Sequence, residues 1–114
     1  MALKSQKTVE SSWYTPEDED EDAANPCRFH IRALSASEQI EVLETFRAGR
    51  PTSLTFRRCF AIGVQKIENY LDGNDRPVKL AAQFLALQDT LDLILEVGAA
   101  VFEKSYLTDE EKKT

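Results

Sequence analysis

The single histidine, His30, is the side chain whose type best suits acid–base or metal chemistry near neutral pH. A general base needs an orienting partner, and a metal site needs further ligands. His30 instead alternates with Arg28 and Arg32, two cations that would repel a metal ion. The favoured interpretation is a histidine on the surface of a strand.

The two cysteines, Cys27 and Cys59, are the candidate nucleophiles. They form no C-x-x-C unit, so their spacing indicates neither a redox pair nor a zinc clamp. An arginine beside Cys59 could lower its thiol pKa and make it reactive, but packing as a small apolar residue is the favoured interpretation. The sequence also has no glycine-rich phosphate loop and no G-x-S-x-G motif. We therefore expect no enzyme activity, no metal site and no cofactor.

Six consecutive carboxylates run from Glu17 to Asp22. They repel one another with little apolar surface nearby, so residues 1–25 are predicted to form a disordered acidic N-terminal arm. The arm can be a solubility tail, or it can dock on a basic partner with Trp13 and Tyr14 as aromatic anchors. A calcium loop is disfavoured, because contiguous carboxylates lack its alternation and its turn glycine.

The charge balance of the 114 residues is acidic, with 20 Asp and Glu against 14 Lys and Arg and a net charge of −6. Phosphate contacts need the opposite sign, so nucleic-acid binding is disfavoured. No run of apolar residues is long enough for a transmembrane helix, and no apolar stretch follows Lys4 and Lys7 as a signal peptide would require. We expect an intracellular protein with reduced thiols.

The ordered part is expected to start at Pro26 with a half-buried strand over residues 27–34, where apolar and polar residues alternate. A capping box at Ser35-Ala36-Ser37-Glu38 then opens a helix that stops at Gly49 and Pro51. A second helix starts at Thr52 or Ser53 and ends near Gly63.

The segment from Val64 to Leu71 fits either a helix or a strand. An extended segment is favoured because the Asp72–Asp75 turn follows it, and because it would pair with the first strand. An apolar run over residues 78–87 comes next, and a helix capped by Asp89 or Thr90 follows it.

The predicted fold is α+β and helix-dominated, with about four helices and a short two-stranded antiparallel element behind the acidic arm. Residues 26–107 would form the compact helix-rich domain. Residues 108–114 would be a truncated helix start or a tail, because the capping box at Thr108 to Glu111 lies so close to the last residue. Candidate partner-binding residues are Trp13 and Tyr14 in the arm, together with Leu91, Ile94, Leu95, Gly98, Val101, Phe102, Tyr106 and Leu107, each of which could also be ordinary core.

Three short motifs resemble the small tail assembly chaperones of long-tailed bacteriophages. They are Arg32-Ala33-Leu34 before a Ser-capped helix, the opening Trp13-Tyr14-Thr15-Pro16, and the ending Ser105-Tyr106-Leu107-Thr108-Asp109-Glu110-Glu111-Lys112-Lys113. The sequence departs from the family at Thr114, where an asparagine is usual.

The resemblance implies a protein that binds and solubilises the long helical tape measure protein and helps to recruit tail tube subunits. It also implies a homo-oligomer that acts in the host cytoplasm during infection and is absent from the mature virion. Many such genes produce a longer form by ribosomal frameshifting. Glu111-Lys112-Lys113 can be encoded as GAA-AAA-AAG, which contains a slippery heptamer.

Two alternatives stay open. A structural head–tail connector or other tail component would be found in purified virions. An acidic inhibitor of a basic host protein, such as a DNA mimic, would need carboxylates held at fixed spacing on an ordered element.

Overall fold

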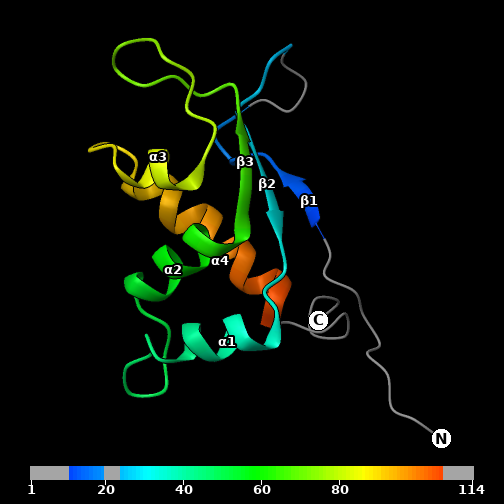
Figure 1. The fold of residues 1–114 in the computed structure, drawn as a ribbon, viewed down its shortest axis with the longest axis vertical. Coiled ribbons are helices and arrows are strands. Elements are labelled where there is room, and N and C mark those ends of the chain that lie inside the picture. Colours follow the sequence, from blue (N-terminus) through cyan, green and yellow to red (C-terminus); the bar gives the residue numbers. More distant parts are fainter. Residues whose placement is uncertain (1–10, 20–23, 107–114) are drawn as a thin grey trace, which may run out of the picture.

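The computed structural model describes residues 11–19 and 24–106. A three-stranded sheet forms one layer, and four helices lie on one of its faces and at its end (Figure 1). This arrangement confirms the predicted helix-dominated α+β fold. The sheet has three strands where the sequence predicted two.

The central strand β2 (Arg28–Arg32) pairs antiparallel with β3 (Val64–Glu68), with Phe29 opposite Ile67. The extended interpretation of this second segment is therefore confirmed. The alternation of β2 places Phe29 and Ile31 in the core and leaves Arg28, His30 and Arg32 on the other face.

The third strand, β1 (Ser11–Tyr14), pairs antiparallel with β2 and places Trp13 opposite His30. It lies inside the segment that was predicted to be a disordered arm, so that prediction is wrong for residues 11–19. Backbone pairing with β2 and contacts made by Tyr14 hold this segment in place. Both involve residues far away in the chain, so no local sequence pattern indicates them. Residues 1–10 and 20–23 lie outside the described residues.

Helix α1 (Ala36–Leu43) begins at the predicted capping box. It ends well before Gly49, where the sequence predicted its stop. The Thr45 hydroxyl donates to the carbonyl of Val42 at 2.6 Å and lies 2.7 Å from Thr55 Oγ1, which turns the chain toward the next helix. Ala48 and Gly49 then adopt positive φ angles of 52° and 74° in a tight turn.

Helix α2 (Ser53–Gly63) follows Thr52, as predicted, and passes directly into β3 at Gly63. A Cβ at Gly63 would lie 2.5 Å from Val101 Cγ1 in the last helix, so glycine is needed there for space. Helix α4 (Leu91–Tyr106) packs along α2. The two crossing helices form the centre of the helical layer (Figure 1).

Helix α3 (Ala81–Leu85) is shorter than the apolar run that predicted it. Val78 and Lys79 lie outside the helix, because their backbones bond to the segment of β3. The Val78 N–H donates to the Tyr70 carbonyl, and the Lys79 carbonyl accepts the Ile67 N–H. The Asp72 carboxylate accepts the N–H groups of Asn74 and Arg76 in the predicted turn.

Three phenylalanines, Phe29 of β2, Phe60 of α2 and Phe84 of α3, meet in the centre of the core. The ring of Phe84 lies 5.4 Å from that of Phe29 and 5.2 Å from that of Phe60. All three are fully buried. This cluster joins the sheet to α2 and α3 and so fixes how the helices sit on the strands.

Candidate protein-binding groove

An apolar groove of about 340 Å³ lies between the start of α2, the end of α3 and the start of α4. That volume is near the lower end of the range of ~300–1,000 Å³ for ligand pockets, so it suits a few side chains of a partner. Six of its ten lining residues are Leu or Ile: Leu54, Leu85, Leu87, Leu91, Ile94 and Leu95.

Two leucines at the groove are strongly exposed. Leu91 has 64% of its surface in solvent and Leu54 has 44%. Scattered exposed leucines are normal on a protein surface, but these two border the same apolar groove. The groove therefore has the composition of a surface that another apolar chain segment can cover.

Arg57 of α2 is the one charged residue among those that line this groove. Its side chain has no hydrogen bond or ion pair within residues 11–19 and 24–106. Three other arginines do have acidic partners there: Arg28 with Glu68, Arg32 with Glu38 and Arg58 with Glu41.

The sequence placed three of these groove residues, Leu91, Ile94 and Leu95, on its candidate binding surface. It missed the groove's other walls, which come from Leu54, Leu85 and Leu87. The one local signal for Leu54 and Leu91 is a leucine in the first turn of a helix next to polar residues. The position of α3, which closes the groove, has no such signal.

Other candidates from α4 lie in the interior. Val101 is fully buried, and Gly98 packs so closely on α2 that an added Cβ would lie 2.1 Å from the Phe56 carbonyl oxygen. Phe102 is half-buried and contacts the rings of Phe56 and Tyr106. These residues pack against α2, and none of them is among the residues that line the groove. Leu107 lies outside the described residues.

The two aromatic candidates of β1 point to opposite faces of the sheet. Tyr14 points inward, and its hydroxyl donates to Glu96 of α4 at 2.6 Å. Burial and that carboxylate raise the pKa of Tyr14. Trp13 lies on the outer face, where the Arg28 guanidinium sits 4.2 Å from its ring and His30 lies beside it. Neither residue borders the groove.

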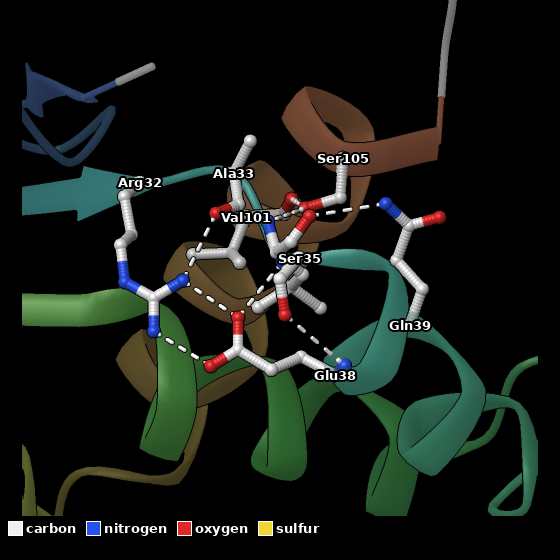
Figure 2. A network of polar contacts seen from close by, with 8 residues as sticks. Arg32, Ala33, Ser35, Glu38, Gln39, Val101 and Ser105 are labelled. Atoms are coloured by element: carbon white, nitrogen blue, oxygen red, sulfur yellow. Dashed lines mark hydrogen bonds and ion pairs between the residues drawn. The ribbon is translucent and has the colours of Figure 1, made fainter. Parts of the chain in front are cut away.

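At the opposite end of α4, polar groups join this helix to α1 and to the segment that connects β2 to α1. We name this cluster the polar junction. Figure 2 shows Arg32 reaching from the end of β2 to Glu38, with bonds of 2.7 and 2.8 Å to its two carboxylate oxygens. Glu38 also accepts the Ser35 N–H in the capping box. The Arg32 hydrogen bonds are the main cause that lowers the pKa of Glu38 to about 2.

Ser105 of α4 completes the polar junction. Its hydroxyl accepts the Leu34 N–H at 2.9 Å and donates to the Val101 carbonyl at 2.7 Å (Figure 2). The Tyr106 hydroxyl donates to the Gln39 carbonyl of α1. Two of the segments noted for their resemblance, Arg32-Ala33-Leu34 and the start of the C-terminal motif, thus contact each other.

The catalytic candidates are held in structural positions. Burial raises the pKa of Cys59 to about 12, and burial with a nearby Glu19 raises that of Cys27 to about 11, so both thiols are held protonated. In the described ranges, no three His, Cys, Asp or Glu side chains gather as metal ligands would. No helix there has both the length and the apolar character needed to cross a bilayer.

Comparisons with protein-family models, with curated proteins and with solved structures give no match to this chain.

Proposed function

We propose that the protein is a tail assembly chaperone of a long-tailed phage, which covers apolar helical stripes of the tape measure protein with its α2–α3–α4 groove. The observation that carries this proposal is the pair of exposed leucines, Leu54 and Leu91, at a groove lined mainly by Leu and Ile. The phage assignment rests on the motifs that resemble the family.

The physical basis is masking of apolar surface. An amphipathic helix presents apolar residues at i, i+4 and i+7, and such a row fits a groove between helices. Burying an exposed leucine stabilises a complex by up to about 1.5–3 kcal/mol. With a net charge of −6, each bound copy would also add repulsion that keeps a long, coated partner from aggregating.

On this proposal the protein works in the host cytoplasm, binds in many copies, helps to recruit tail tube subunits and leaves before the virion is complete. A longer frameshifted form belongs to the same proposal. Its gene would carry the slippery heptamer at the codons for Glu111-Lys112-Lys113.

The test is co-expression of the tagged chain with the tape measure protein of the genome that encodes it. We expect the tape measure protein to be soluble and to co-purify, whereas Leu91→Asp should weaken binding at least about 10-fold. The reason is that the substitution removes a large exposed apolar side chain from the groove and puts a charged group where apolar side chains of the partner would be buried. Leu91 is 64% exposed, so the free energy of unfolding should stay within about 0.5 kcal/mol.

Leu71→Asp is the matched control, because Leu71 is 55% exposed and is not among the residues that line this groove. It should leave binding unchanged. A genome that encodes no tape measure protein, or equal effects of the two substitutions, would contradict the proposal.

A further inference from the structure

The charge at the groove has the opposite sign to the charge of the whole chain. The protein carries a net charge of −6, yet the charged residue that lines the groove is Arg57. Its guanidinium has no partner within the described ranges, and the lining residues beside it are apolar or neutral. An arginine at this position offers up to five N–H donors to a group that arrives with the partner.

We infer that the groove selects an amphipathic helix with a Glu or Asp beside its apolar stripe, and that Arg57 binds this carboxylate. The inference rests on the proposed function and adds the chemistry of the segment that is bound. A planar guanidinium pairs with a carboxylate through two parallel hydrogen bonds, a geometry that neutral side chains do not reproduce. Apolar burial supplies the affinity, and Arg57 sets the choice between helices.

The overall charge predicts the reverse preference, which makes the inference easy to test. A chain of net charge −6 attracts cationic peptides in general. At about 0.15 M salt the Debye length is only about 8 Å, so this general attraction is screened more strongly than a pair in direct contact. A preference for an acidic helix under these conditions would therefore report contact with Arg57.

The experiment uses two designed peptides of about 18 residues, each helical with one leucine stripe. One has a glutamate on each flank of the stripe, and the other has a lysine at each of these positions. Because the charge is on both flanks, one charged group lies near Arg57 whichever way the peptide helix runs along the groove. Affinities for the full-length chain are measured by fluorescence anisotropy at about 0.15 M salt.

We expect the glutamate peptide to bind about 5-fold more tightly than the lysine peptide, as befits a partly exposed ion pair at the edge of an apolar contact. Arg57→Glu should reverse this preference. Arg76→Glu changes the net charge equally in the exposed 72–76 turn, outside the groove, and should preserve the preference.

Equal affinities for the two peptides, binding of neither, or an unchanged preference in Arg57→Glu would overturn the inference. The proposed function fails separately. A tape measure protein that binds while the peptides show no preference would leave the chaperone proposal standing. A glutamate preference without tape measure binding would leave the groove chemistry standing.

Discussion

The two ends of helix α4 are built differently. At its C-terminal end, Ser105 hydrogen-bonds to Leu34 in the segment that connects β2 to α1, and Tyr106 hydrogen-bonds to α1. At its N-terminal end, Leu91 is mostly in solvent beside the groove. One helix thus runs from the polar junction to an open apolar surface.

This difference separates stability from binding. At the polar junction each polar group has a partner, and removing one partner leaves the other buried and unsatisfied, which costs about 1–3 kcal/mol. At the groove, the exposed leucines contribute little to the stability of the folded chain, because much of their apolar surface is still in water. They contribute most of their burial free energy when another segment covers them. Substitutions at the junction should therefore change unfolding, and substitutions at the groove should change binding.

Gly98→Ala is expected to have the largest effect, because it breaks the helix crossing that connects the two regions. An added Cβ would lie 2.1 Å from the Phe56 carbonyl oxygen, and backbone cannot rotate away as a side chain can. Forced separation of α2 and α4 should cost about 3 kcal/mol or more in the free energy of unfolding, measured by urea denaturation.

Gly73→Ala is the control for this prediction. A Cβ at Gly73 would have no atom within 4 Å, so the same substitution should change the free energy of unfolding by less than about 1 kcal/mol. Equal stabilities of the two variants would show that α2 and α4 do not approach as closely as described.

Ser105→Ala should have an intermediate effect, confined to the polar junction. It leaves the buried Leu34 N–H without its acceptor, so a loss of about 2 kcal/mol in the free energy of unfolding is expected. Affinity for a groove-binding helix, measured well below the unfolding transition, should not change. Leu91→Asp should give the reverse result, with weaker binding and unchanged stability. A variant that changes both properties together would contradict the separation of the two regions.

The sequence predicted the features that depend on neighbouring residues. The alternation in β2 and the capping box at Ser35 both lie where the sequence indicated. The extended interpretation of the segment that begins at Val64 was also correct for Val64–Glu68, where β3 runs, because the Asp72 turn left little room for a longer helix. Periodicity and capping are local, so they can be recognised without knowledge of the partner segments.

The missed features depend on residues far apart in the chain. Strand β1 is held by pairing with β2 and by the Tyr14–Glu96 bond, whose residues are 82 positions apart. Helix α1 ends early because Thr45 bonds to Thr55 of the next helix. From the sequence, Arg57 is one of several residues on the polar side of α2. Only the positions of α3 and α4 make it part of the groove.

Glu38→Gln should have the smallest of the three effects and should sharpen the account of the polar junction through its pH dependence. The Arg32 bonds lower the pKa of Glu38 to about 2, from an ordinary 4.5. The stabilisation is therefore complete above about pH 4.5 and is lost as the pH falls toward 2. The side chain is 25% exposed, so after allowance for screening it is worth about 1–2 kcal/mol.

Glutamine can still accept the Ser35 N–H in the capping box, so Glu38→Gln removes the charge while it keeps the cap. Urea denaturation at pH 7 and at pH 2.5 should show a variant that is less stable than the wild type at pH 7 and nearly equal to it at pH 2.5. Glu41→Gln, on the same helix, is the control. Its pair with Arg58 is longer, at 3.4 Å, and both side chains are more than 40% exposed, so less than about 0.5 kcal/mol is expected at either pH. If the two variants lost equal stability at pH 7, Glu38 would be no more than another surface charge. Of the two junction residues tested, only Ser105 would then contribute specifically to the free energy of unfolding.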